Sequence, residues 1–161
     1  SPAPAGMKTA AGDELLQVMP GLIAASWFAM MAINGALAQG LAARFGVNQR
    51  PSPAMADIEL PGYLVVILAV AAAVGALGGA TGFIGITVEA IVIMAYFFQG
   101  LGLLHALAYR SQAPFVVLLG VYGVLAIFIA ATVVVALLGV IEQWVQWRRR
   151  WAASGPKREI K

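Results

Sequence analysis

The stretch that decides the fold is Phe83-Ile-Gly-Ile-Thr-Val-Glu-Ala-Ile-Val-Ile-Met-Ala-Tyr-Phe-Phe-Gln-Gly-Leu-Gly-Leu-Leu-His-Ala-Leu107. It contains no Lys, Arg or Asp and only one Glu. The hydrocarbon core of a bilayer is about 30 Å thick, and a helix crosses it with about 20 residues at roughly 1.5 Å each. The length and apolar character of this stretch therefore predict a membrane-spanning helix.

The rest of the chain has the same apolar character. Its 161 residues are 61% hydrophobic and 11% charged, with no cysteine and a mean hydropathy of +0.89. A soluble domain carries about 25% charged residues, so this chain has too few charges to cover a surface that faces water. This excludes a soluble enzyme, a disulfide-stabilised secreted domain and a disordered chain. The apolar runs are continuous rather than alternating, which favours helices over a β-barrel.

Three further stretches are long enough to span a membrane, and the predicted fold is an all-α integral membrane bundle of four transmembrane helices. Pro20 and Pro61 stand in the expected first turns of two of them, where a missing N–H costs nothing. Because the chain begins at Ser1 without a signal peptide, we expect either an upstream segment that has been removed or the C-terminal part of a longer product. The expected parts are a linker over 1–12, a membrane domain over 13–151 with spans at 19–41, 60–77, 83–107 and 115–141, an interfacial helical extension over 142–151, and a basic tail over 152–161.

The distribution of cations predicts the orientation of these spans. Four spans place both termini on one side, and the side with more Lys and Arg faces the cytoplasm. Seven cations share the side of the termini and three lie opposite, so we expect cytoplasmic termini. The seven are Lys8, Arg148, Arg149, Arg150, Lys157, Arg158 and Lys161, and the three are Arg44, Arg50 and Arg110. The basic tail indicates a bilayer with anionic headgroups as a partner, and nucleic acid is not expected.

The chain carries aromatic and basic residues together near its C-terminal end. Trp144, Trp147 and Trp151 fall at helical spacing on one face. Indole rings at headgroup depth beside cationic side chains are typical of a membrane-interface anchor. We expect the three tryptophans to form this anchor together with Arg148, Arg149 and Arg150, and a protein docking surface is the alternative.

Glu89 is the only carboxylate in the middle of a predicted span. Burying an ionisable group there costs at least ~2.5 kcal/mol unless it is paired or protonated, which makes it a candidate solute- or proton-linked residue. At 100° per residue it shares a face with small and polar residues that include Tyr96. Helix rise places Ser26 and Thr132 at a similar depth, so both are candidate partners of Glu89. A purely structural role for these polar groups is the competing interpretation.

Two amides are expected at one depth on the outer side of the midplane. Helix rise places Asn34 of the first span and Gln99 of the third about 6 Å from the centre. We predict an Asn34–Gln99 contact that packs the two spans together. Glycines at 75, 78, 79 and 82 predict a tight antiparallel hairpin between the second and third spans rather than a phosphate-binding loop.

Catalytic constellations are missing from the sequence. With one His and no Cys, metal clusters and cysteine nucleophiles are excluded, and the chain has no GxSxG or HExxH motif. We therefore expect a protein that is not an enzyme and that needs no cofactor. A bound haem, pigment or lipid stays open, with His105 as the only plausible axial ligand.

Five strings occur in order along the chain. They are Pro20-Gly-Leu-Ile-Ala-Ala-Ser-Trp27, Asn34-Gly-Ala-Leu-Ala-Gln-Gly40, Arg50-Pro-Ser-Pro53, Phe97-Phe-Gln-Gly-Leu-Gly-Leu-Leu-His-Ala106 and Glu142-Gln-Trp-Val-Gln-Trp-Arg-Arg-Arg150. With these strings the chain resembles, from about residue 13 onward, the C-terminal half of the YybS-like family of bacterial multi-spanning membrane proteins, a domain of unknown function, and its alphaproteobacterial type in particular. The resemblance implies a multi-pass protein of the bacterial inner membrane. It also implies a fold similar to the substrate-binding S components of energy-coupling-factor vitamin transporters, of whose solute pocket this half would lack a part.

Two functional hypotheses follow from these observations. The first is a non-enzymatic accessory or assembly subunit of a bacterial membrane complex, or a transport-related subunit of S-component-like fold. Its expected partners are other membrane subunits or the missing N-terminal half. The alternative is a transporter component that binds a small solute at the polar face around Glu89.

Overall fold

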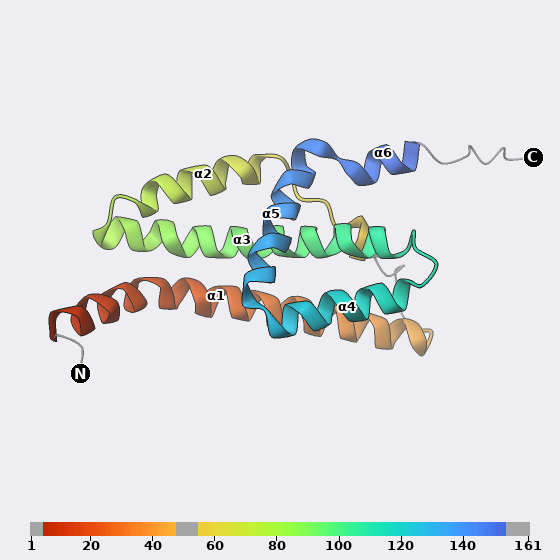
Figure 1. The fold of residues 1–161 in the computed structure, drawn as a ribbon, viewed down its shortest axis with the longest axis horizontal. Coiled ribbons are helices and arrows are strands. Elements are labelled where there is room, and N and C mark those ends of the chain that lie inside the picture. Colours follow the sequence, from red (N-terminus) through yellow and green to blue (C-terminus); the bar gives the residue numbers. More distant parts are fainter. Residues whose placement is uncertain (1–4, 48–54, 154–161) are drawn as a thin grey trace, which may run out of the picture. The chain divides into compact units, whose positions relative to one another are not determined.

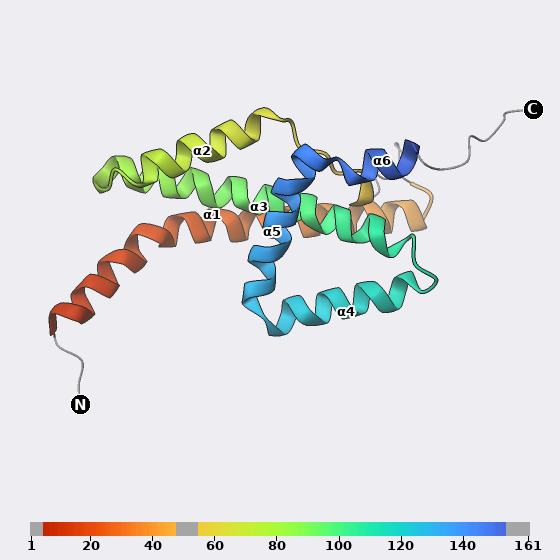
Figure 2. The same cartoon turned by 45° about the horizontal axis from the view of Figure 1, so that its top comes forward.

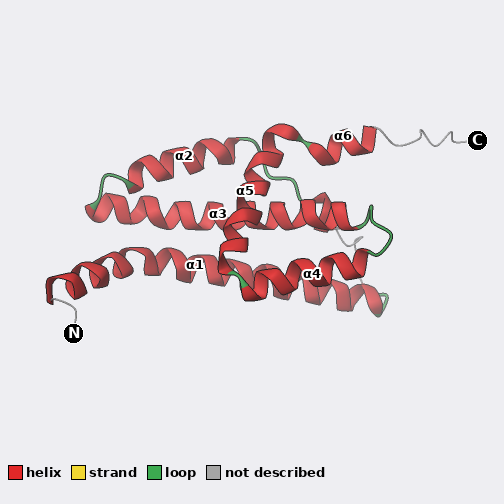
Figure 3. Ribbon diagram, in the orientation of Figure 1, coloured by secondary structure: helices red, strands yellow, loops and turns green. Residues whose placement is uncertain are grey.

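The computed structural model describes residues 5–47 and 55–153, and every regular element among them is helical (Figure 3). The continuously apolar runs form helices because a helix satisfies its backbone hydrogen bonds internally. The elements are α1 (Ala5–Arg44), a 3-10 turn η1 (Met55–Asp57), α2 (Tyr63–Gly75), α3 (Gly79–Ala108), α4 (Pro114–Ile127), α5 (Ile129–Val145) and α6 (Trp147–Ala153).

The chain divides into two compact units, which we describe separately. The N-terminal unit comprises residues 1–52 and 61–95, and it holds α1, α2 and the first part of α3. The C-terminal unit comprises residues 53–60 and 96–161, and it holds η1, the second part of α3, α4, α5 and α6.

In the N-terminal unit, α2 and the first part of α3 form an antiparallel hairpin (Figure 1). A Cβ built on Gly82 would lie 2.9 Å from the carbonyl oxygen of Gly75, and one on Gly85 would overlap the Gly75 nitrogen. The turn between the helices places Gly78 and Gly79 at φ +70° and +61°, which favours glycine. The predicted tight hairpin is therefore confirmed, with Gly85 as an additional contact.

In the C-terminal unit, α4 folds back from the end of α3, and α5 then crosses the second part of α3 (Figure 2). The crossing is close because glycines meet there. A Cβ on Gly100 of α3 would overlap the carbonyl oxygen of Val135, and a Cβ on Gly139 of α5 would overlap that of Tyr96. Tyr96, Leu101 and Val135 are buried around this crossing.

The predicted helix over 115–141 is interrupted at Phe128, so the prediction of one straight span is wrong in this respect. Phe128 has extended backbone angles, φ −115° and ψ 103°, and it separates α4 from α5. Residues 124–132 contain neither Pro nor Gly, and no local signal marks the break. The glycine crossing of α5 over α3 supplies a tertiary reason for α5 to leave the line of α4, because packing overrides helix propensity.

Two other predicted boundaries also change. The helix expected over 19–41 begins at Ala5, so residues 5–12 belong to α1 and not to a linker, while residues 1–4 lie outside the described part. Pro20 consequently lies inside α1, where its ring removes one backbone hydrogen bond. The stretch predicted at 83–107 is helical throughout within α3.

Within residues 5–47 and 55–153, two helices are long and apolar enough to cross a membrane. They are residues Val18–Arg44 of α1 and Gly79–Ala108, which is α3 itself. The helices α2, α4 and α5 are apolar but shorter, with 13, 14 and 17 residues. Of the four full-length spans expected from the sequence, two correspond to helices of sufficient length within the described residues.

The close approach of α2 and α3 predicts that Gly85→Ala weakens the N-terminal unit. The added methyl group would overlap backbone atoms that cannot move independently, at a cost of about 1–3 kcal/mol. Gly123→Ala in α4 is the matched control, because a Cβ there meets nothing within 4 Å. Denaturation with sodium dodecyl sulfate from mild detergent micelles, followed by circular dichroism, measures both. Equal stability of the two variants would contradict the close packing.

Candidate functional site

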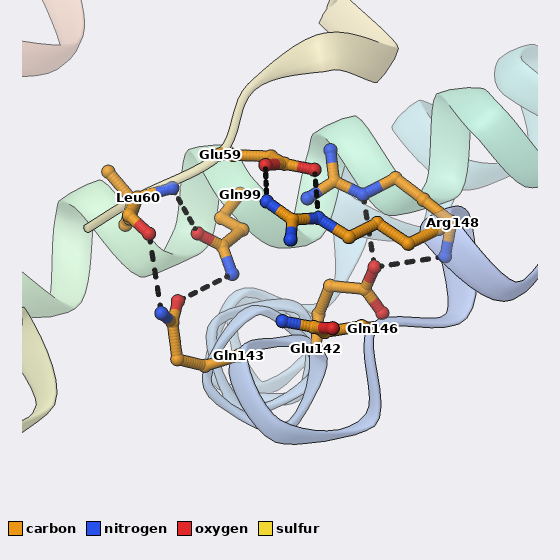
Figure 4. Close-up of a pocket in the computed structure, with 8 residues that line it drawn as sticks. Glu59, Leu60, Gln99, Glu142, Gln143, Gln146 and Arg148 are labelled. Atoms are coloured by element: carbon orange, nitrogen blue, oxygen red, sulfur yellow. Dashed lines mark hydrogen bonds and ion pairs between the residues drawn. The ribbon is translucent and has the colours of Figure 1, made fainter. Parts of the chain in front are cut away.

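The side chain of Gln99 forms the centre of a buried polar network in the C-terminal unit (Figure 4). Its Oε1 accepts a hydrogen bond of 2.9 Å from the Leu60 N–H. Its Nε2 donates to the carbonyl oxygen of Gly139 at 2.9 Å and to Oε1 of Gln143 at 3.4 Å. Gln143 Nε2 in turn donates to the Leu60 carbonyl at 3.3 Å. The two glutamines thus bind both backbone groups of Leu60 and join it to α3 and α5.

A buried ion pair lies beside this network. Glu142 is 4% exposed, and its Oε1 accepts from Arg148 through the side-chain Nε and the backbone N–H, both at 3.1 Å. Its Oε2 accepts from the Trp147 N–H at 3.0 Å. The carboxylate therefore caps the first turn of α6 and neutralises the guanidinium in one arrangement.

Arg148 extends this pair to the segment that precedes α2. Its Nη1 donates to the carbonyl oxygens of Ala56 at 2.8 Å and Ile58 at 2.7 Å. Gly102 of α3 permits this approach, because a Cβ there would lie 2.6 Å from the Met55 carbonyl oxygen. Non-helical peptide groups need such partners when water is excluded.

The geometry depends on Gln146, which ends α5 in the left-handed region at φ 51° and ψ 46°. On one continuous helix, Glu142 and Arg148 would be six residues apart and would point in widely different directions. The turn at Gln146 redirects the chain so that α6 begins against the Glu142 carboxylate.

A second ion pair lies at the exposed edge of the network. Arg149 donates to Glu59 from Nε at 3.3 Å and from Nη2 at 2.8 Å. These hydrogen bonds lower the pKa of the Glu59 carboxyl from its ordinary value, against partial desolvation, and the positive charges of Arg149 and Arg148 act in the same direction. Both side chains are exposed, so water screens the pair and its contribution to stability is small.

The cavity within the network is small. Its volume is about 50 Å³, whereas pockets for small organic molecules measure roughly 300–1,000 Å³. The polar side chains around it largely bind one another or nearby peptide groups, so most of their hydrogen-bonding groups are already paired within the protein. Its lining consists of Glu59, Leu60, Gln99, Glu142, Gln143, Gln146, Arg148 and Arg149.

The residues predicted around Glu89 are divided between the two units. Glu89 lies half-buried on α3 in the N-terminal unit, with Oε2 3.8 Å from the Cβ position of Gly75. Ser26 is exposed on α1, and its hydroxyl donates to the Ile23 carbonyl at 2.8 Å. Tyr96 and Thr132 belong to the C-terminal unit. The Tyr96 side chain is fully buried, and its hydroxyl has no hydrogen-bond partner among the described residues.

The amide of Gln99 binds other partners than the one predicted. Both of its N–H groups are directed to α5, and its oxygen binds Leu60. Asn34 is exposed on α1. The expectation of a structural role for Gln99 therefore stands, with Gly139 and Gln143 in place of Asn34.

The predicted Trp/Arg anchor is not one helical face, because the turn at Gln146 separates Trp144 on α5 from the two tryptophans on α6. Arg148 points inward to Glu142, and Arg149 binds Glu59. Arg150 is exposed on α6.

Three segments expected on opposite sides of the membrane meet in the C-terminal unit. Arg149 of α6 binds Glu59 at 2.8 Å, and the guanidinium of Arg110 lies 5.3 Å from the centre of the Trp151 ring. The sequence placed Arg110 on the side opposite the C-terminal tail. The contact between Arg110 and Trp151 does not fit that separation, and the break at Phe128 allows the contact because α4 and α5 do not continue in one direction.

Sequence reasoning missed Glu142, Gln143, Glu59 and Leu60 as members of the network. Glu142 and Gln143 directly follow the apolar part of α5, and in the sequence they resemble the polar edge of a membrane span. A run of Glu-Gln at the end of a membrane helix, followed by three arginines, was the available signal.

Among the described residues, no group of three or more His, Cys, Asp and Glu side chains is placed to hold a metal ion. His105 Nδ1 donates to the Leu101 carbonyl oxygen, 2.9 Å away, and its ring meets the Tyr122 ring edge-on at 5.9 Å between centroids. These contacts attach the end of α3 to α4.

The apolar helices and the internally closed polar network define a helical membrane protein. The model of a family described as "Predicted membrane protein (DUF2232)" matches residues 4–142. The chain belongs to this family. No curated relative and no solved structure matches it closely enough to add to that assignment.

The buried ion pair predicts that Glu142→Gln destabilises the C-terminal unit by about 3 kcal/mol, because it leaves the Arg148 guanidinium buried without a counter-charge. Glu59→Gln makes the same chemical change at the exposed pair and is expected to cost at most about 1 kcal/mol. Denaturant titration in detergent compares the two variants. Similar losses of stability in both variants would show that the buried Glu142–Arg148 pair contributes no more than the exposed Glu59–Arg149 pair.

Proposed function

We propose that this chain is a non-enzymatic accessory or assembly subunit of a complex in the bacterial cytoplasmic membrane. In this proposal it is a multi-pass protein of YybS-like type and corresponds to the C-terminal half of such a protein. Other membrane subunits or the missing half are its protein partners, and anionic lipid headgroups contact its basic end.

The observation that supports this role is the closure of the polar network around Gln99 and Glu142. Their hydrogen bonds end on neighbouring peptide groups and side chains, and the cavity beside them measures about 50 Å³. An enzyme needs a pocket with convergent polar groups that are available to a substrate. Groups that are already bound to the protein itself are suited to holding a fold together.

The outer surfaces of the helices agree with a role inside a membrane assembly. Large apolar side chains are exposed along α1, α4 and α5, among them Met31, Phe115 and Leu137. Such surfaces are stable only against lipid or against other apolar helices.

The proposal predicts stoichiometric recovery with a membrane partner. The chain, tagged and expressed from its native locus, is purified in mild detergent and analysed by size-exclusion chromatography with mass spectrometry. We expect one or more membrane proteins in fixed ratio through two successive purification steps. An unrelated tagged membrane protein at the same expression level is the control. Recovery as a free monomer would contradict the accessory role.

A transport-related role is the second candidate, and Glu89 supports it. This carboxylate lies half-buried on the membrane-spanning α3, and its Oε2 is 3.8 Å from the Cβ position of Gly75 on α2. A solute bound there would offer the carboxylate a polar partner.

The transport role predicts a solute that stabilises the wild-type chain and not Glu89→Gln. At 100 times its dissociation constant a ligand adds about 2.7 kcal/mol, or about 5–10 °C in Tm for a chain of this size. Thr87→Val is the matched control, because the Thr87 hydroxyl already donates to the Phe83 carbonyl on the same helix. A solute panel that shifts neither the wild type nor the control would remove this candidate.

A further inference from the structure

Contacts in the C-terminal unit place three hydrophilic segments on one side of the bilayer. Arg148 and Arg149 of α6 bind the segment before α2, and Trp151 of α6 lies under Arg110, just after α3. The Glu59–Arg149 pair is exposed and charged, so it belongs at the water-facing surface. The segment before α2, the turn after α3 and the C-terminal helix therefore share one face.

The helices α4 and α5 connect two of these segments without crossing the membrane. With 14 and 17 residues, they are about 21 and 25 Å long, and the break at Phe128 separates them, so they do not form one helix across the roughly 30 Å core. α4 starts after the hydrophilic turn at Arg110, and α5 ends before the arginines of α6. Both outer ends of the pair therefore belong to the same polar face.

The tip between α4 and α5 is apolar and uncovered. Ile127, Phe128 and Ile129 are 75%, 59% and 88% exposed. A turn in water is usually built from Gly, Pro, Asn, Asp or Ser, whereas three large apolar side chains at a turn are favourable in hydrocarbon. The tip therefore belongs inside the bilayer.

The backbone at this tip is partly satisfied without water. The Phe128 N–H donates to the Val124 carbonyl at 2.8 Å, and the Ala131 N–H donates to the Phe128 carbonyl at 2.9 Å. Phe128 itself thus has both backbone groups paired, as a break in a lipid environment requires.

The charge distribution identifies the shared face as cytoplasmic. In sequence, residues 44–59 hold two cations, residues 108–113 hold one and residues 146–161 hold six, which makes nine of the ten Lys and Arg residues. The tenth, Lys8, precedes the first crossing. The positive-inside rule applies to such short segments next to membrane helices.

We propose that α4 and α5 form a re-entrant hairpin that enters and leaves the bilayer at the cytoplasmic face. The chain then crosses three times, through α1, through α2 with the short non-helical stretch before it, and through α3. The C-terminal helix is cytoplasmic, and the beginning of α1 lies on the outer side. This topology goes beyond the proposed function, because it holds whichever complex or solute the chain serves.

Cysteine labelling tests this topology directly, since the chain contains no cysteine of its own. Single variants Gln112→Cys after α3, Arg150→Cys in α6 and Leu77→Cys in the turn between α2 and α3 place thiols at exposed positions. The full chain is expressed in a bacterial inner membrane and treated with a membrane-impermeant maleimide. Spheroplasts present the outer face, and inverted vesicles present the cytoplasmic face.

We expect Gln112→Cys and Arg150→Cys to be labelled in inverted vesicles only, and Leu77→Cys in spheroplasts only. Labelling of Gln112→Cys and Arg150→Cys from opposite faces would overturn the hairpin, because a straight helix over 115–141 separates them. Ala113→Cys repeats the Gln112 position, and labelling after detergent solubilisation verifies that each thiol is reactive. The purification and solute experiments do not depend on this result.

Discussion

The hydrogen bonding of the non-helical residues 56–60 is the constraint on which the C-terminal unit depends. The Leu60 N–H donates to the side chain of Gln99, which is buried. A peptide group packed against a buried side chain has little access to water, and leaving it unpaired costs several kcal/mol in an apolar medium. Gln99, Gln143 and Arg148 supply the missing partners, so three helices are fixed around one short segment. Glu142 makes the arrangement electrically neutral.

Much of the helical content follows from the sequence, because continuous apolar runs have one solution in a membrane. The hairpin between α2 and α3 also follows, since glycines four residues apart permit backbone contact. Gln99 was recognisable as a polar group that needs partners, but its partners were not. Estimating the depth of a residue from helix rise assumes straight spans, and that estimate pointed to Asn34 as the partner of Gln99. In the structure, the glycines at 100 and 139 bring α5 against Gln99 instead.

The break at Phe128 and the turn at Gln146 could not be predicted, and together they decide the site. Neither residue is a glycine or a proline, and local propensity favours continuing the helix through both. Tertiary contacts on the far side of each break account for them: the Gly100–Gly139 crossing for α5, and the Glu142 cap for α6. The pairing of Glu142 with Arg148 is a consequence of the second break, which explains why periodicity could not reveal it. The role of Glu89 stays a hypothesis.

The hydrogen bonds between residues 56–60 and the C-terminal helices also impose an order on biosynthesis. The partners in these bonds are separated by 83 to 92 residues in sequence. At about 5–20 residues per second, translation delivers the last partner roughly 4 to 18 s after the carbonyl groups that need it. During that interval Gln99 is the earliest partner to emerge, 39 residues after Leu60. The segment before α2 therefore lacks most of its hydrogen-bond partners until α5 and α6 are made. Its hydrogen bonding is complete only when α6 has been synthesised.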